Sequence, residues 1–281
     1  MALRQNRAML GSLLDRLRPA ASVRIDDALW RSTFDALPFL ARLDAAERAV
    51  LRDLAQRFLA AKEFATAGDL ELTAAMQVSI AAQACLPVLR LGLDGYGGWK
   101  SIVVYPDEFL VPREVTDEAG VVHEYVEPIS GEAWHGGPLL LSWADVQAVD
   151  GAYNVVIHEF THKLDMASGD ADGLPPFDRR LHAGLNPRHW RQVLDDAFER
   201  LNAELDLIEA EIPADVDPES GQADRYFARL PLDPYAATDP GEFFAVSSEA
   251  FFVAPARLRD AFPEWYALLA AYFLQDPLAG A

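Results

Sequence analysis

The chain has 281 residues, with 24 Lys and Arg against 44 Asp and Glu, so its formal net charge at pH 7 is −20. This negative charge would repel a phosphate backbone, which argues against nucleic acid as a direct partner. Apolar residues make up 51% of the chain, enough to bury a substantial core in one large domain or two closely packed subdomains.

The N-terminal segment does not resemble a targeting peptide. Its basic residues are Arg4, Arg7, Arg16 and Arg18. Asp15 interrupts them, and neither a long apolar segment nor a small-residue cleavage site follows. No stretch is long enough to span a membrane, and the lone Cys85 fits a buried core position. We therefore expect a reduced, cytoplasmic setting, with no membrane partner.

The first ninety or so residues have a helical pattern. Leucines and alanines recur every three or four residues from Leu40 to Leu59 and again from Leu72 to Leu89. We predict a helical region over residues 1–95.

The pattern becomes β-rich between Tyr96 and Trp143. Ser101–Tyr105, Gly120–Val126 and Gly137–Trp143 are the predicted strands, with Pro and Gly between them. Pro138 suits a sheet edge, where the last strand could pair with an extended peptide, but an ordinary core strand fits equally well. From Val149 onward helices dominate, so the predicted fold class is α+β with a small central β-sheet.

The stretch from Val155 to Asp165 contains an H-E-x-x-H motif formed by His158, Glu159 and His162. On a helix, a four-residue step brings both imidazoles onto one face, where they can reach a single ion. Glu159 lies beside that face, and the pattern is typical of zinc peptidases. The alternative is a pair of histidines on a solvated helix face.

A catalytic zinc ion usually takes a third protein ligand. The remaining histidines, His123, His135, His182 and His189, have no partner at ligand spacing. Residues 235–249 are predicted to form a loop and then a helix, with Asp239 as its cap and Pro240 at its first position. Glu242 and Glu249 share one face of this helix. Either is a possible ligand, because Glu242 could instead complete a capping box and Glu249 could instead orient a ligand.

Residues 158–165, HEFTHKLD, followed by residues 235–249, YAATDPGEFFAVSSE, resemble the bacterial Mlc titration factor A proteins. The resemblance continues upstream through residues 68–73, 80–85 and 99–106, and covers most of the chain from about residue 50. These relatives are zincin-like metallopeptidases. The resemblance implies one zincin-like (gluzincin) domain over residues 1–281, with residues 96–281 as its catalytic core.

The resemblance also implies roles for individual residues. His158, His162 and Glu242 would bind one Zn²⁺ per chain, and Glu249 would lie behind them. Glu159 would be the general base. Tyr235 would stabilise the oxyanion, although a ring that only packs beneath the second helix is the alternative. The same ligands would also accept cobalt or manganese in vitro.

Two further features remain open at this point. Asp165 lies on the ligand side of its helix and could fix an imidazole tautomer, but a helix cap or a surface acid fits as well. The acidic stretch from Asp206 to Asp224, which includes Pro213, Pro218 and Gly221, is predicted to be a surface insertion that could cover the substrate cleft.

The resemblance implies an aminopeptidase-like zinc peptidase that acts on small or flexible peptides. The alternative is a binding protein that sequesters an Mlc-like transcriptional repressor and so regulates sugar phosphotransferase genes, with a zinc site that is structural or unused. One protein could have both roles.

Overall fold

The computed structural model describes residues 23–116, 122–148, 151–217 and 220–279. The N-terminal arginine cluster, the first two residues of the predicted strand 120–126, Val149 and Pro218 lie outside these ranges.

The first part of the described chain is mainly helical, as predicted. It contains α2 (Asp27–Asp35), the short 3-10 helix η1 (Pro38–Arg42), α3 (Ala45–Ala61) and α4 (Ala74–Cys85). Asp44 and Glu47 form a capping box at the start of α3, and the hydroxyl of Thr73 accepts from the backbone N–H of Met76 at the start of α4. Cys85 is buried, as expected.

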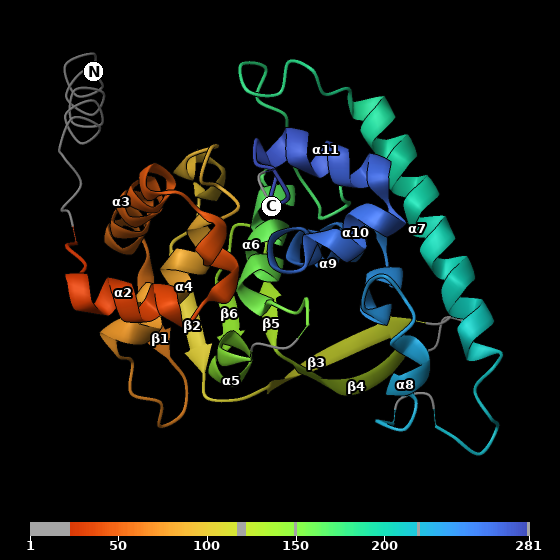
Figure 1. The fold of residues 1–281 in the computed structure, drawn as a ribbon. Helices are drawn as coiled ribbons and strands as arrows, with labels where there is room; N and C mark the ends of the chain where they lie inside the picture. The colour runs from red at the N-terminus through yellow and green to blue at the C-terminus, as the bar shows by residue number, and fades with distance from the viewer. Residues whose placement is uncertain (1–22, 117–121, 149–150, 218–219, 280–281) are drawn as a thin grey trace, which may run out of the picture.

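A four-stranded sheet lies at the centre of the molecule (Figure 1). Its strands are β1 (Glu63–Thr66), β2 (Ser101–Tyr105), β6 (Leu139–Ser142) and β5 (Gly131–Ala133), in that order. β1, β2 and β6 are parallel, and β5 runs antiparallel to β6. The predicted strand 101–105 is confirmed. β1 was not predicted, because it is four residues long and lies within the region assigned to helices.

Of the two alternatives for the strand 137–143, the ordinary core strand is the one that the structure shows. Its strand, β6, is hydrogen-bonded to β2 on one side and to β5 on the other, and all four of its residues are buried. Pro138 precedes the strand, so its missing N–H does not interrupt the ladder. β5, which was not predicted, is the edge strand on this side of the sheet.

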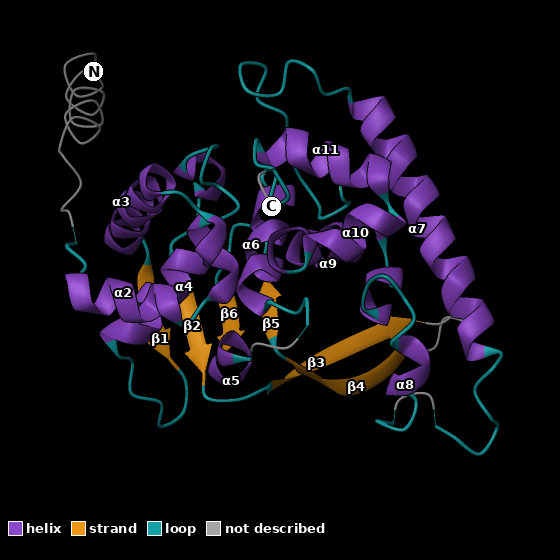
Figure 2. Cartoon of the chain, in the orientation of Figure 1, coloured by secondary structure: helices purple, strands orange, loops and turns teal. Residues whose placement is uncertain are grey.

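Two further strands, β3 (Phe109–Thr116) and β4 (Val122–Ile129), form a separate antiparallel hairpin. This hairpin extends away from the central sheet toward α8 (Asp224–Phe227), as Figure 2 shows. The predicted strand 120–126 corresponds to β4, and β3 was not predicted.

Helices dominate after the sheet, as predicted. They are α5 (Trp143–Gln147), α6 (Val155–Asp165), α7 (Pro187–Glu209), α8, α9 (Pro240–Val253), α10 (Pro255–Ala261) and α11 (Pro263–Phe273). Two more 3-10 helices are η2 (Leu93–Tyr96), between α4 and β2, and η3 (Pro234–Ala237), before α9. Proline occupies the first turn of α7, α9, α10 and α11, where a backbone N–H has no partner within the helix.

The acidic stretch 206–224, predicted to be a surface insertion, begins and ends in helices. Residues 206–209 form the last turn of α7, and the described residues that follow are mostly exposed loop. Asp224 begins α8.

The core is organised around α6 and α9. All eleven residues of α6 are buried. Phe160 on α6 contacts the rings of Phe58, Tyr96 and Trp99, with centroids 5.5, 5.0 and 5.8 Å away. α9 packs beside α6 and also contributes Phe243 and Phe244 to an aromatic cluster with Trp190 and Trp265.

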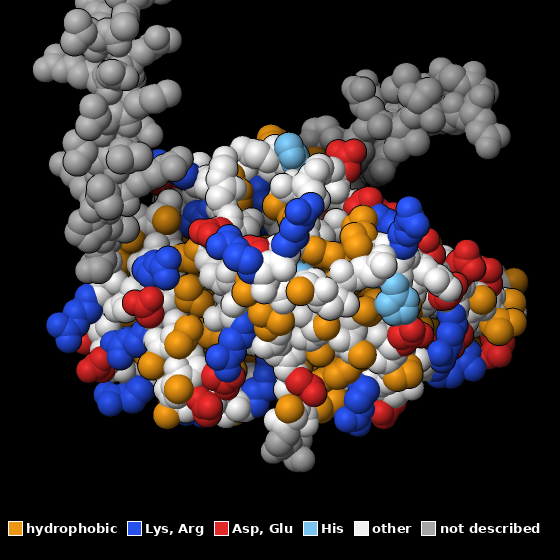
Figure 3. Space-filling model, turned by 90° about the horizontal axis from the view of Figure 1, so that it is seen from above, with side chains coloured by type: hydrophobic (Ala, Val, Ile, Leu, Met, Phe, Trp, Pro, Cys, Tyr) orange, Lys and Arg blue, Asp and Glu red, His pale blue; other side chains and the backbone are white. Residues whose placement is uncertain are grey.

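The surface seen from above carries basic and acidic side chains interspersed with apolar ones (Figure 3). Among the described residues, no helix combines the length and apolarity needed to cross a membrane.

Phe160→Ala should lower the free energy of unfolding by about 3–5 kcal/mol, because it leaves a cavity where α3, η2 and α6 meet. Leu207→Ala, at a side chain that is 68% exposed, is the control and should change stability little. Urea unfolding of both variants measures the difference, and equal midpoints would contradict this account of the core.

Candidate metal centre and cleft

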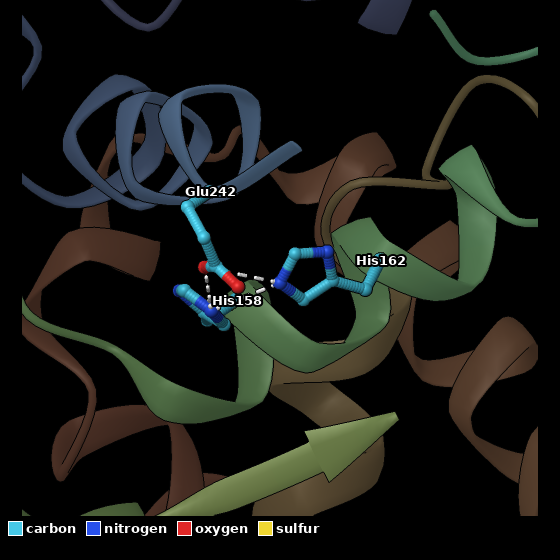
Figure 4. Close-up of side chains that lie close together, drawn as sticks. All are labelled: His158, His162 and Glu242. Carbon is cyan, nitrogen blue, oxygen red and sulfur yellow. Dashed lines mark hydrogen bonds and ion pairs between the residues drawn. The ribbon is translucent and has the colours of Figure 1, made fainter. Parts of the chain in front are cut away.

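The metal-site helix α6 begins at Asn154, whose side-chain oxygen accepts from the backbone N–H of Ile157 at 2.9 Å. The apolar residues Ile157, Phe160 and Leu164, which recur at helical spacing, are buried in the core. His158 and His162 project from the helix on the side of α9 (Figure 4). They are 9% and 7% exposed, so the alternative of a solvated helix face is wrong.

Glu242 reaches the two histidines from α9. Its Oε2 lies 3.1 Å from His158 Nε2 and 3.3 Å from His162 Nε2 (Figure 4). The two Nε2 atoms are 3.1 Å apart. Side chains separated by eighty residues of sequence therefore converge on one point.

The local structure at the start of α9 explains why Glu242 is available. Asp239 caps the helix by accepting from the N–H groups of Gly241 and Glu242, at 2.7 and 3.0 Å, and Pro240 occupies the first turn, as predicted. In a capping box, Glu242 would bond back to the cap residue. Its carboxylate instead contacts the histidines.

The donor set fits a divalent metal ion. One ligand atom from each of His158, His162 and Glu242 lies within 4.8 Å of the others. Two imidazoles and one carboxylate are a frequent protein ligand set for catalytic zinc, and they leave a coordination position for water or substrate. These three residues could therefore hold the ion.

Contacts among His158, His162 and Glu242 shift the pKa values of Glu242 and His158. Burial raises the pKa of Glu242, but hydrogen bonds from His158 and His162 outweigh it and hold that pKa well below its usual range. Burial favours neutral His158, yet the bonds to Glu242 and Glu249 raise its pKa well above the usual value. A metal ion would therefore displace a proton from the imidazole of His158, while the carboxylate of Glu242 is already ionised.

Glu159 is 4% exposed and lies beside the ligands. Burial raises the pKa of Glu159 to about 7, although the two histidines oppose this shift. Among the described residues, its Oε2 has no hydrogen-bond partner. Gly131 on β5 packs directly against it, since a Cβ at that position would lie 2.6 Å from Glu159 Oε1. The edge strand can approach this carboxylate only because residue 131 is glycine.

Tyr235 lies in η3, just ahead of α9. Its ring centroid is 6.0 Å from that of His158, and the residue is 51% exposed. It lines the same cavity as the ligands, so it does not only pack beneath α9.

Two further buried acids, Glu249 and Asp165, have different partners. Glu249 Oε1 accepts from His158 Nδ1 at 2.8 Å, which leaves His158 Nε2 facing Glu242. Asp165 is fully buried, so it is not a surface acid; its Oδ2 accepts from the N–H of Gly173 at 2.6 Å. Burial raises the pKa of Asp165 to about 7.

A cavity of about 1320 Å³ opens beside the ligands. One wall is the end of β4 and all of β5, and the opposite wall is formed by residues of the segment 224–235. Arg257 holds the second wall through bonds to the backbone oxygens of Ala228 and Leu230. Of the described residues of the acidic stretch, the last one, Asp224, lines the cavity.

The first wall is fixed to α6 by Lys163. This side chain is buried, and its Nζ donates to the backbone oxygens of Trp134, Gly137 and Pro138 at 2.6, 3.0 and 3.3 Å. Those residues form the turn from β5 to β6. Lys163 therefore ties the edge strand to the helix that carries the histidines.

Sequence reasoning missed several residues around this centre. Gly131 and Lys163 had no motif to mark them, because their importance depends on the neighbours that the fold supplies. Asn154 carried a usable signal, since an asparagine immediately before an apolar-periodic segment is a typical helix cap.

Comparison with known proteins gives consistent results. A family profile described as "Glucose-regulated metallo-peptidase M90" matches residues 13–274. A protein of Klebsiella pneumoniae subsp. pneumoniae named Mlc titration factor A is 38% identical over 247 residues, which are 87% of this chain and 85% of that protein. Proteins with the same name from Serratia proteamaculans and Salmonella arizonae are 38% and 37% identical, over 90% and 89% of this chain and 88% and 92% of their own lengths.

Zinc binding should tighten as the pH rises, because the raised pKa of His158 means that the ion must displace a proton. Calorimetric titration with zinc in two buffers of different ionisation enthalpy measures the protons released per ion. Glu242→Ala should bind zinc more weakly. Equal affinity at pH 6 and pH 8 in the unaltered chain would contradict the assigned protonation state.

Proposed function

Because the chain belongs to the glucose-regulated metallopeptidase family M90, we propose that it is a zinc-dependent peptidase of the gluzincin type, with aminopeptidase-like activity on small or flexible peptides. The main support is the convergence of His158, His162 and Glu242 at an open cavity, with Glu159 beside them. The zinc identity rests on the preference of this ligand set.

Glu159 is the proposed general base. When bound at the ligands, zinc lowers the pKa of a water and polarises a peptide carbonyl. The Oε2 of Glu159 has no hydrogen-bond partner in the described parts of the chain, and it can accept the proton of the attacking water, then return it to the departing amine. The pKa of about 7 reflects burial, and a bound cation would lower it and favour the basic form.

Tyr235 is the proposed oxyanion donor. Its ring lies in the cavity wall near His158, and its exposed position leaves it accessible to a bound peptide. A phenol hydroxyl placed at the developing oxyanion stabilises the transition state more than the ground state.

β5 is the proposed seat of the substrate backbone. The backbone N–H of Ser142 donates to the backbone oxygen of Ser130, and the backbone N–H of Trp134 donates to that of Pro138. Residues 130 and 134 therefore direct their backbone groups toward β6. Groups alternate along an antiparallel strand, so those of Gly131 and Ala133 face the open edge. An extended peptide could pair with both residues beside Glu159.

A second candidate function is suggested by the names of the relatives. They are called Mlc titration factor A, so we propose that an Mlc-like repressor is a partner of this chain too. That binding need not use the metal centre.

Glu159→Gln should reduce peptide hydrolysis by about 10²-fold or more while zinc binding is retained, because the amide cannot take up a proton. Cleavage of a mixed peptide library by the zinc-loaded protein, before and after chelation, measures the loss. Repressor binding should survive the change. Unaltered hydrolysis in Glu159→Gln, or hydrolysis that resists chelation, would rule out the proposed chemistry.

Ala133→Pro should raise KM for extended peptides and leave zinc affinity unchanged, because it removes one N–H from the open edge of β5. Steady-state kinetics with peptides of increasing length checks this. The matched control is the unfolding midpoint, which should change little at an edge position. An unchanged KM would place the substrate backbone elsewhere.

A further inference from the structure

We infer that Gln83 and Asn154, which lie outside the ligand set, are positioning residues that fix His158 for metal binding through Glu249. The inference rests on the proposed metal site. It concerns a continuous line of buried hydrogen bonds that starts on α4, far from the ligands in sequence.

Asn154 is the junction of this line. Its backbone N–H donates to Glu249 Oε2, and its backbone oxygen accepts from the N–H of His158 at 3.0 Å. Its side-chain oxygen caps α6 at Ile157, and its side-chain Nδ2 donates to Gln83 Oε1 at 2.7 Å. One residue therefore sets both the start of the metal-site helix and the position of the acid behind it.

The pattern of donors fixes the orientation of each amide. Because Asn154 Oδ1 accepts from Ile157, its Nδ2 must face Gln83. Gln83 must then present its oxygen to Asn154, and its Nε2 donates to Ser79 Oγ at 3.3 Å. Gln83 thus keeps Asn154 from turning.

Glu249 connects Asn154 to His158 through its two carboxylate oxygens. Its Oε2 is held by Asn154, and its Oε1 accepts from His158 Nδ1. With Nδ1 occupied as a donor, the proton that a metal ion displaces from His158 leaves Nε2, and the lone pair of the neutral ring is then on the atom that faces Glu242 and His162. The four members are at most 9% exposed, so water cannot readily replace a lost partner.

The test is zinc affinity of the full-length protein, measured by competition with a chromophoric chelator. Gln83→Met removes the acceptor while keeping the side-chain length. Loss of an outer partner of a metal ligand typically weakens binding by roughly 10–100-fold, and we expect about tenfold for this more remote residue. Ser79→Ala, which removes only the partner of the Gln83 amide, is the milder variant and should weaken binding less.

Gln275→Met is the matched control. Gln275 makes a comparable hydrogen bond, from its Nε2 to the backbone oxygen of Leu86 at 2.9 Å, but has no bond to this line. It should leave zinc affinity unchanged. A double-mutant cycle then separates positioning from general destabilisation: in a Glu249→Ala background, Gln83→Met should no longer change zinc affinity, because its route to His158 is gone.

The outcomes are distinct. If the unaltered protein binds no zinc, the proposed function fails and the inference fails with it. If it binds zinc but neither Gln83→Met nor Ser79→Ala weakens binding, only the inference is overturned. The same holds if Gln83→Met weakens binding equally with and without Glu249, since the effect would then not pass through the acid.

Discussion

The complete burial of α6 is the constraint on which the site depends. A helix with two histidines, a glutamate, a lysine and an aspartate on a buried segment is costly unless most of its polar groups have partners. The protein provides them from several elements: Glu249 for His158, backbone oxygens for Lys163, and the N–H of Gly173 for Asp165. Stability and ligand geometry therefore depend on the same contacts.

Among the described residues, three buried side-chain atoms of α6 have no hydrogen-bond partner: Glu159 Oε2, His162 Nδ1 and Asp165 Oδ1. The first of them lies where chemistry is proposed. Glu159 keeps one carboxylate oxygen without a protein partner among the described residues, beside an edge strand that has no side chain at Gly131. A buried acceptor left unpaired costs free energy, and that cost is typical of a group reserved for a reacting molecule. The other polar residues of α6 restrain the helix, so the unpaired oxygen has a defined position.

The parts of the site that could be predicted from sequence are those set by local spacing. The four-residue step places His158 and His162 on one face, and the Asp-Pro pair marks the start of α9, which brings Glu242 to its first turn. The choice of Glu242 over Glu249 needed family resemblance. Strand order was not predictable, because β1 and β5 have only four and three residues, too few for a periodic pattern. The edge position depends on pairing between distant segments, so Pro138 alone could not decide whether its strand lies at an edge or in the core.

Lys163 and Arg257 attach the two walls of the cavity to different parts of the chain. Because this lysine clamps the turn beyond β5 to the helix that carries the histidines, the strand and the ligands form one preassembled unit. The opposite wall, residues 224–235, belongs to a different part of the chain and is attached through Arg257. The set of accepted substrates can therefore change by exchange of residues 224–234, in evolution or by loop grafting, while Tyr235, β5 and the histidines are inherited intact.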